Sequence, residues 1–223
     1  GISLDGVFST EVDDRCRRPR LDYIRDFLGI TTPLVRPTLR ITDEDREWAL
    51  KTASDLGQPL VLLFPQCVWK PREWPANYWV ELAWKLKANG IPVALMYQGD
   101  DLRFRNTPMY YWNIPIPRIA ALMQEAALVI GNDSFPAHLA GTVGVSTLAL
   151  MGPTRPTVFS HMPNVDCLST GRIECTGCHF QAPFRASCDQ GCQSLYRLFP
   201  EDVLARALDQ LRTRRSPERI IAF

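Results

Sequence analysis

The sequence of 223 residues has no apolar run of about 18 residues, the length that a membrane-spanning helix requires. It also has little net charge, because 25 Lys and Arg residues face 24 Asp and Glu residues, and no long run of one sign stands out. This balance argues against a nucleic-acid-binding surface, which needs clustered positive charge. The sequence shows no internal repeat, no low-complexity segment and no signal-peptide pattern at its start. We therefore predict a cytoplasmic protein with no membrane span and no nucleic-acid partner.

The sequence contains enough apolar residues to form a hydrophobic core. Hydrophobic residues make up 46% of the chain, which suits one large domain or two small ones. The chain begins with Gly1 and not with Met, which suggests a tag remnant, a processed product or a fragment of something longer. Residues 1–40 are irregular apart from a short helical pattern over residues 21–29, and we interpret them as a linker or arm. Residues 41–223 form the predicted domain.

Within that domain, helical and strand-like patterns alternate. We expect strands over residues 59–65, 91–98, 127–131 and 145–152, each a short apolar run typical of a strand buried on both faces. We expect helices over residues 43–57, 76–90, 116–126, 134–144 and 200–215. Such alternation implies parallel βαβ units with right-handed crossovers. The predicted fold is therefore α/β, a Rossmann-like three-layer sandwich around a parallel sheet.

The stretch Gly131-Asn132-Asp133-Ser134 follows the third expected strand, at the sheet edge where parallel folds bind ligands. Gly131 is expected to let the backbone turn sharply near a ligand, and Asp133 or Ser134 could cap the next helix. The start of that helix favours a phosphate or diphosphate. Ser134 and His138 are four residues apart and share one helix face. The alternative is that Asp133 only caps the helix and His138 only packs against the sheet.

A loop with basic side chains follows the first expected strand. Lys70 and Arg72 lie in it, and both suit a diphosphate, with Arg72 able to make the bidentate contact that Lys cannot. The alternative is a solvated loop with an ordinary surface arginine. After the second strand, Asp100 or Asp101 could accept hydrogen bonds from sugar or ribose hydroxyls, although surface carboxylates are common.

Cysteines cluster in the loop of residues 167–192. Four of them have the spacing C-x2-C-x9-C-x3-C, which can surround a tetrahedral metal: Cys175, Cys178, Cys188 and Cys192. We predict a structural zinc or iron, since four thiolates leave no open position for catalysis. The alternative is a set of buried free or oxidised thiols. Cys167 could replace one ligand, His179 is a further candidate, and Cys16 and Cys67 have no obvious partners.

Three motifs in order resemble glycosyltransferase family 9, which includes the heptosyltransferases of lipopolysaccharide core assembly. "GNDSFPAHLAGTVGVSTLALMGPT" is similar to that family's G-x-D-S-G-x-x-H-L-A signature with its following strand and G-P-T turn. "KPREWPANYWVELAWKL" is similar to its basic-x-Trp-Pro loop, and the cysteine stretch leading into "LFPEDV" resembles its C-terminal region. The resemblance covers about residues 40–210. It implies the C-terminal half of a two-domain GT-B fold, which holds a nucleotide sugar such as ADP-heptose.

The resemblance also implies roles. Asp133 would contact the transferred sugar, and Ser134 with the helix start would hold the diphosphate beside His138. Arg72 would neutralise charge on the leaving nucleotide diphosphate, and Thr154 would add a hydroxyl. This is electrostatic stabilisation, so no catalytic metal is expected. The loop and strand-end residues Lys70, Asp101, Gly131 and Asn132 complete the predicted donor site.

Two departures from the family pattern qualify this hypothesis. Phe135 stands where the family usually has Gly, and the N-terminal acceptor domain with its catalytic base has no room in 223 residues. We therefore expect a donor-binding half that transfers little alone, with a glycan, lipid-linked or protein acceptor. A homo-oligomer or a partner chain would supply the acceptor domain. The alternatives are a non-catalytic nucleotide-binding or assembly module, another GT-B enzyme such as an epimerase, and, last, a zinc-knuckle nucleic-acid binder.

Overall fold

The computed structural model describes residues 20–32, 37–99, 101–104, 107, 109–111, 114–170, 176–178 and 191–215. The strands are β1 (Val61–Phe64), β2 (Val93–Tyr97), β3 (Met109–Tyr111), β4 (Leu128–Asn132), β5 (Thr147–Leu150) and β6 (Val165–Leu168). The helices are α2 (Arg20–Phe27), α3 (Asp43–Leu56), α4 (Ala76–Ala88), α5 (Ile116–Glu125), α6 (Phe135–Val143), α7 (Gln193–Tyr196) and α8 (Pro200–Arg215). Short 3-10 turns are η2 (Lys70–Arg72), η3 (Leu102–Phe104) and η4 (Pro156–Phe159).

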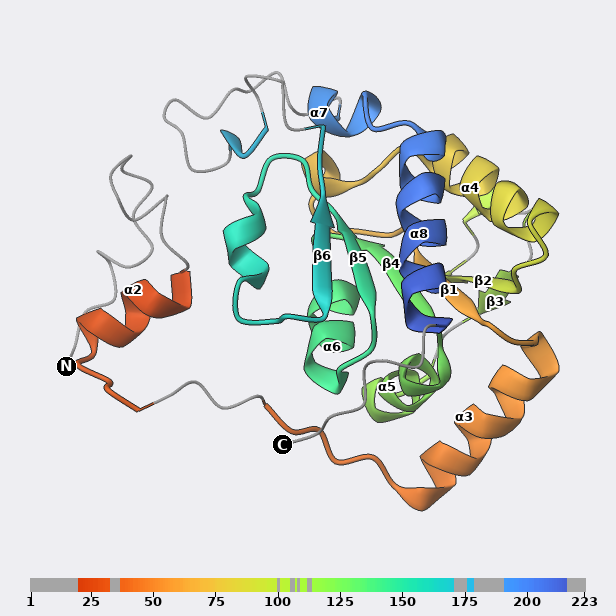
Figure 1. Cartoon of the computed structure of the whole chain (residues 1–223), viewed down its shortest axis with the longest axis horizontal. Coiled ribbons are helices and arrows are strands. Elements are labelled where there is room, and N and C mark those ends of the chain that lie inside the picture. The colour runs from red at the N-terminus through yellow and green to blue at the C-terminus, as the bar shows by residue number, and fades with distance from the viewer. Residues whose placement is uncertain are drawn as a thin grey trace.

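The six strands form one parallel sheet in the order β3-β2-β1-β4-β5-β6 (Figure 1). The chain moves outward in one direction from β1 to β3 and in the other from β4 to β6. The order therefore reverses between β1 and β4, where Phe64 pairs with Gly131. In parallel sheets of this kind, ligands bind at the carboxyl ends of the strands at such a reversal point.

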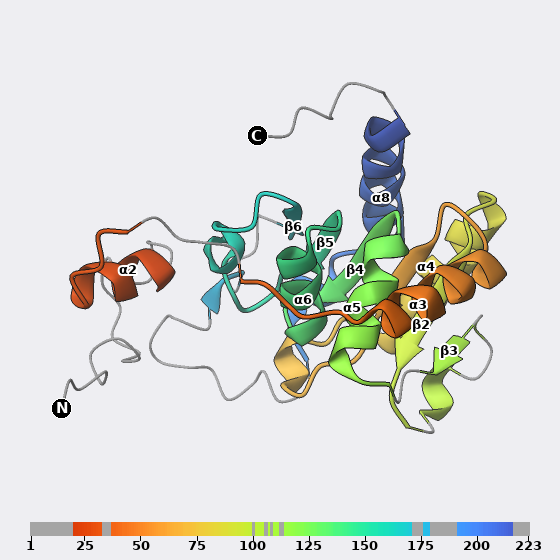
Figure 2. The same ribbon diagram turned by 90° about the horizontal axis from the view of Figure 1, so that it is seen from below.

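An apolar core lies on each face of the sheet. On one face, α4 and α8 bring Trp79 and Val203 against Leu63, and all three side chains are fully buried. On the other face, α3, α5 and α6 cover Leu62, which packs with Leu122. Adjacent strand residues point to opposite faces, so Leu62 and Leu63 belong to different cores. The predicted three-layer sandwich is confirmed (Figure 2).

Nine expected elements of the domain are present, with ends that differ by a few residues from those expected. They are the strands β1, β2, β4 and β5 and the helices α3, α4, α5, α6 and α8. No local sequence pattern predicted β3, β6 or α7. β3 and β6 are short edge strands, and β6 is only partly buried, so neither carries the strong apolar run of a central strand. They form strands because β3 pairs in parallel with β2 and β6 pairs in parallel with β5.

The short helix expected over residues 21–29 is α2, which lies apart from the sheet in both views (Figures 1 and 2). The division of the chain near residue 40 into an arm and a domain remains a prediction. Among the residues described, no helix combines the length and the apolar character needed to cross a membrane.

Candidate functional site

Three loops leave the carboxyl edge of the sheet at its reversal point. The first follows β1 and comprises residues 65–75, which we call the basic loop; it contains η2. The second joins β4 to α6 and contains Asp133 and Ser134. The third follows β5 and comprises residues 152–155, which we call the 152–155 loop. Because β1, β4 and β5 are neighbours in the sheet, these loops converge.

Asp133 is the centre of the candidate site, and only 2% of it is exposed. The Thr154 hydroxyl donates a hydrogen bond to its Oδ2. Arg72 Nε lies 3.5 Å from the same oxygen, and Arg72 Nη1 donates to the Asp133 carbonyl at 3.4 Å. His138 Nε2 lies 3.6 Å from Asp133 Oδ1, and its ring stacks on Phe159 with centroids 4.4 Å apart. The structure thus brings together four of the residues that the sequence assigned to the site.

The surroundings of Asp133 favour its ionised form. Burial by itself would raise the pKa of this carboxyl group. Hydrogen bonds from His138 and Thr154, together with the nearby Arg72 charge, oppose burial and outweigh it, so the pKa of Asp133 lies below its ordinary value of 3.8. The site therefore holds a buried negative charge beside a guanidinium.

Asn132 and Trp69 hold the basic loop in place. Asn132 is 1% exposed; its Oδ1 accepts from the Trp74 N–H at 3.0 Å, and its Nδ2 donates to the Pro65 carbonyl at 2.8 Å. Both polar ends of this side chain therefore bond within the protein and join β4 to both ends of the loop. The Arg72 guanidinium lies over the Trp69 ring, 5.0 Å from its centroid. This cation–π contact and the Asp133 contacts together orient Arg72.

Lys70 and Asp101 belong to a second charged group at the same edge. Lys70 Nζ lies 2.6 Å from Glu73 Oε2, and Arg103 Nη2 lies 3.3 Å from Glu73 Oε1. Arg103 also contacts Asp101 at 2.6 Å, and its hydrogen bonds lower the pKa of Asp101. Two positive and two negative side chains therefore pair with one another. Asp100, the other acidic residue considered for this position, is outside the described residues.

The start of α6 differs from what the sequence suggested. Ser134 is the N-cap, but its side chain makes no capping hydrogen bond, and the Asp133 carboxylate instead contacts Thr154, His138 and Arg72. The capping role expected of Asp133 or Ser134 is therefore wrong, because the buried carboxylate has stronger partners. Pro136 lies in the first turn and has no backbone N–H to donate. Phe135, beside it, is 41% exposed.

The sharp turn expected at Gly131 is also absent. Gly131 lies within β4, and its φ is not positive. A Cβ at this position would meet Phe64 Cβ at 3.6 Å, an ordinary contact. A central strand passes through this glycine, so the chain turns only beyond it.

Two of the four predicted metal ligands, Cys175 and Cys188, lie outside the described residues. Cys192 is buried, and a Cβ on Gly152 would lie 3.0 Å from its Sγ. Cys178 follows Gly177, whose N–H donates to the Gly152 carbonyl at 2.8 Å. Both described cysteines thus belong to segments that contact Gly152 in the 152–155 loop.

In the described part of the chain, no three metal-binding side chains gather at one place, so the four-cysteine metal site remains a prediction. Cys167 as a replacement ligand likewise remains a prediction. Burial, aided by the charges of Asp166 and Asp133, raises the pKa of its thiol to about 12.

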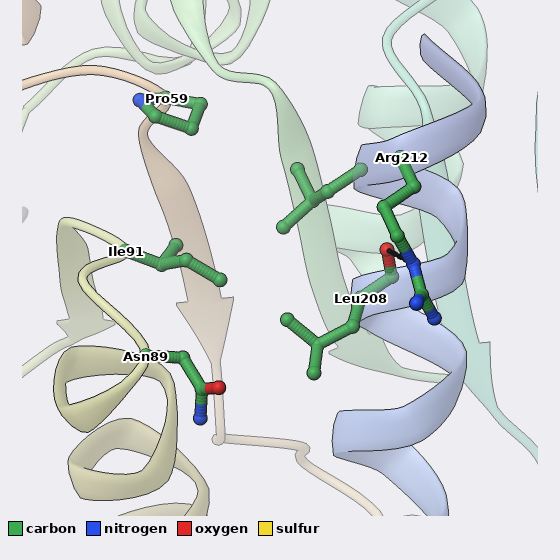
Figure 3. Close-up of a pocket in the computed structure, with 6 residues that line it drawn as sticks. Pro59, Asn89, Ile91, Leu208 and Arg212 are labelled. Carbon is green, nitrogen blue, oxygen red and sulfur yellow. Dashed lines mark hydrogen bonds between the residues drawn. The ribbon is translucent and has the colours of Figure 1, made fainter. Parts of the chain in front are cut away.

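A cavity of about 190 Å³ lies at the opposite edge of the sheet (Figure 3). Its lining residues come from α8 and from the segments before β1 and β2: Pro59, Asn89, Ile91, Leu208, Leu211 and Arg212. Pro59 and Ile91 precede the strands, so the cavity is at their amino ends. None of the predicted site residues lines it, and we place the candidate site on the geometry around Asp133.

Four residues that were not predicted contact the predicted site residues: Trp69, Glu73, Arg103 and Phe159. Trp69 and Glu73 flank η2, so their nearness in sequence to Lys70 and Arg72 was a usable signal. Arg103 had the same signal, because it lies two residues after Asp101. Phe159 had no such signal, because it reaches His138 only through the fold.

The sequence profile of glycosyltransferase family 9 (heptosyltransferase) matches residues 20–182. Lipopolysaccharide heptosyltransferase 2 of Escherichia coli K12 is 24% identical over 166 residues, which cover 66% of this chain and 48% of that protein. The glycosyltransferase family 9 structure from Veillonella parvula has a TM-score of 0.68 at 20% identity, covering 88% of this chain and 61% of that one. The iron-containing dodecameric glycosyltransferase TibC of enterotoxigenic E. coli has a TM-score of 0.64 at 16% identity, covering 91% and 55%.

The chain spans less than half of the length of the curated relatives it matches. The solved structures share its fold, a parallel sheet with helices on both faces as in the GT-B glycosyltransferases of this family. The profile match covers more than half of the chain, and it includes the basic loop, Asp133, His138 and Thr154. The chain belongs to glycosyltransferase family 9, the heptosyltransferase family.

Proposed function

We propose that this chain is the donor-binding part of a heptosyltransferase and that it holds a nucleotide diphosphate sugar of the ADP-heptose type. The observation that carries the proposal is the buried Asp133 carboxylate beside Arg72 at the reversal point of the sheet. A carboxylate accepts hydrogen bonds from sugar hydroxyls, and a guanidinium binds phosphate oxygens in bidentate fashion. Both groups in one place match a sugar diphosphate. His138 and Thr154 keep Asp133 ionised for that contact.

The proposed reaction is an inverting transfer. An acceptor hydroxyl oxygen attacks the anomeric carbon, the bond from that carbon to the diphosphate oxygen breaks, and the bonding electrons leave with the diphosphate. The hydroxyl proton passes to a base outside this chain. Arg72 stabilises the charge that develops on the leaving diphosphate. Its Nε is buried against Asp133, but 29% of the Arg72 side chain is exposed, which leaves part of it open to a diphosphate.

The remaining predicted residues have supporting roles in this proposal. Ser134, whose hydroxyl caps nothing, would bond a diphosphate oxygen at the positive end of α6. Gly131 and Asn132 are the last two residues of β4, and Asp133 follows them directly. Lys70 would add positive charge, and Asp101 would meet ribose hydroxyls. Both act from within the ion-pair group at that edge.

The acceptor would be a lipopolysaccharide-type glycan, another glycan, a lipid-linked sugar or a protein, bound by a separate domain. That domain would come from the same polypeptide or from a partner chain. Support comes from three apolar side chains at the carboxyl edge: Val68, which is fully exposed, Leu102 at 61% and Phe135 at 41%. Exposed apolar groups beside a polar site favour a partner surface. The reaction would take place in the cytoplasm.

The cysteine segment would hold a structural zinc or iron through Cys175, Cys178, Cys188 and Cys192. The proposal is supported by their spacing and by the description of the structural relative TibC as iron-containing. Four thiolates would fill the coordination sphere, so the metal would stabilise this segment and would not take part in transfer.

A second candidate function is a nucleotide-binding or assembly module without catalysis. The observation that favours it is the start of α6, where the Phe135 ring is exposed and Pro136 lacks an N–H group for a phosphate. In this case the fold would bind a nucleotide or a protein partner and transfer nothing. Diphosphate binding distinguishes the donor part from an assembly module, and transfer with an acceptor domain present distinguishes it from a nucleotide-binding module.

The test is calorimetric titration of the purified chain with ADP, UDP and GDP. We expect one diphosphate to bind and Arg72→Ala to weaken it about tenfold or more, or about 1.4 kcal/mol. Arg206→Ala is the matched control, because Arg206 is likewise paired with an aspartate, Asp166, but outside the site. This control should bind within about twofold of wild type. No binding of any diphosphate at millimolar concentration would contradict the proposal and favour the assembly module.

A further inference from the structure

The segment of residues 192–198, which contains α7 and which we call the α7 segment, contacts the 152–155 loop. Leu195 and Cys192 pack directly on Gly152: a Cβ there would lie 2.7 Å from Leu195 Cγ and 3.0 Å from Cys192 Sγ. Both distances are shorter than ordinary contacts, so only glycine fits without a shift of the neighbours. Gly152 is two residues from Thr154, which bonds to Asp133. The α7 segment therefore supports one side of the candidate site.

The same segment also contacts the basic loop. Trp74, which is fully buried, donates its indole N–H to the Leu198 carbonyl at 2.8 Å. Its backbone N–H bonds to Asn132 Oδ1, next to Asp133 in the chain. Trp74 is two residues beyond Arg72. The α7 segment therefore supports the opposite side of the site as well.

Hydrogen bonds from other parts of the chain hold the α7 segment in place. The Ser194 side chain is fully buried, and its hydroxyl lies 2.8 Å from that of Thr176 and 3.1 Å from that of Thr170. Nearby, the Tyr78 hydroxyl donates to the Tyr196 carbonyl at 3.2 Å. These bonds tie α7 to α4, to the end of β6 and to the residues before Cys178. The α7 segment is therefore held by hydrogen bonds while it contacts both the basic loop and the 152–155 loop.

We infer that the α7 segment positions Arg72 and Thr154 against Asp133, with Trp74 and Gly152 as the positioning residues that transmit its placement. Both residues are buried, so neither is expected to contact a substrate. Trp74 acts through the basic loop on Arg72, and Gly152 acts through the 152–155 loop on Thr154. The consequence for donor binding rests on the proposed function, whereas the positioning itself does not.

The first test needs no ligand. Carbon-detected NMR of the full chain follows the titration of the Asp133 carboxyl group in wild type, Trp74→Phe and Gly152→Ala. Arg72 and Thr154 lower the pKa of Asp133, so displacing either should raise it. Leu122→Ala is the control, because Leu122 is equally buried but lies in the core on the other face of the sheet, away from Trp74 and Gly152. We expect the control to lose stability and leave the pKa of Asp133 unchanged.

The second test is calorimetric titration of the same variants with the diphosphate that wild type binds. Trp74→Phe and Gly152→Ala should weaken binding about fivefold or more, whereas Leu122→Ala should not. If Gly152→Ala fails to fold, Leu195→Ala removes the same contact without adding a clash.

The outcomes separate the inference from the proposed function. An unchanged pKa of Asp133 in folded Trp74→Phe together with folded Gly152→Ala or Leu195→Ala would overturn the inference. A raised pKa in these variants, with no diphosphate bound by wild type, would support the positioning and overturn the donor-site proposal alone. A shift in Leu122→Ala as large as in Trp74→Phe would show a general loss of packing and overturn the specific role of the α7 segment.

Discussion

At the level of single residues, the candidate site depends on how Asp133 is kept ionised while buried. A buried charge is costly unless it is paired and hydrogen-bonded, and Asp133 obtains partners from three separate segments of the chain. Removing one partner leaves the carboxylate with an unmet hydrogen bond, which costs more than the bond itself contributes. The residues around Asp133 therefore affect stability as well as binding.

Thr154 offers a direct check of this argument. Thr154→Val keeps the shape but removes the hydroxyl that donates to Asp133 Oδ2, and Thr154 is 1% exposed. We expect Thr154→Val to lower the free energy of unfolding by about 1–3 kcal/mol, measured by urea denaturation. Thr154→Ser retains the hydroxyl and should lose less. Equal losses in the two variants would mean that the methyl group matters and the hydrogen bond does not.

The pH dependence of stability gives a second check at this scale. The pKa of Asp133 is lowered in the folded chain, so its ionisation stabilises the fold above the ordinary value of 3.8. That contribution is lost as the pH falls through the lower pKa of the folded state. We expect the difference in unfolding free energy between wild type and Asp133→Asn to be constant from about pH 5 upward and to shrink below about pH 4. Urea denaturation across this range measures it, and a difference that grows on acidification would contradict the lowered pKa.

At the level of elements, α3 shows how a helix begins from local sequence. Thr42 is its N-cap, and the Thr42 side chain accepts a hydrogen bond from the Asp45 N–H at 3.2 Å. Acidic residues fill the first turn and complement the helix dipole: Asp43, Glu44 and Asp45. A sequence pattern of this kind identifies a helix start without knowledge of the fold.

Thr42→Ala removes this cap. We expect it to lower the free energy of unfolding by about 1 kcal/mol in urea denaturation, because one N–H group at the helix start loses its partner. Thr42→Ser should stay close to wild type. Thr213→Ala, in the last turns of α8, removes a threonine hydroxyl that is not an N-cap and serves as the control. A loss for Thr42→Ala no larger than the control's would show that the cap contributes nothing.

At the level of the whole molecule, the proposed metal site predicts a definite composition. The purified chain should contain about one zinc or iron ion per chain by elemental analysis, as a four-thiolate site requires. Cys192→Ser should lose most of this metal, whereas Cys67→Ser should keep it because Cys67 lies in the basic loop outside the cluster. Metal retained in full by Cys192→Ser would exclude the proposed ligand set.

In the proposal, this chain binds the donor and a separate domain binds the acceptor, which predicts what the chain does alone. It should bind a nucleotide diphosphate and form no glycosylated product when given ADP-heptose and a lipopolysaccharide core acceptor, as measured by mass spectrometry. The physical reason is that the base and the acceptor-binding surface lie outside this chain in the proposal. Product formed by the chain alone, and abolished by Arg72→Ala, would show that these 223 residues are sufficient for transfer.

The central elements of the fold could be predicted from the sequence because their patterns are local. β1 and β4 are short apolar runs, and α4 has buried residues at helical spacing, so each is recognisable alone. β6 could not be predicted, since it becomes a strand by pairing with β5, with Leu148 opposite Asp166. The same reason applies to the α7 segment, whose position depends on Trp74 and Gly152 from distant parts of the chain.

For the candidate site, the sequence by itself determined which chemical groups are present and on which side of the sheet they lie. Arg72, Asp133 and Thr154 each follow a strand, and parallel strands carry their carboxyl ends to one edge. Only the tertiary structure decided that they meet at one carboxylate, with Phe159 against His138. The order of strands in the sheet and the hydrogen bonds across loops are long-range facts, and no local pattern encodes which distant side chains become neighbours.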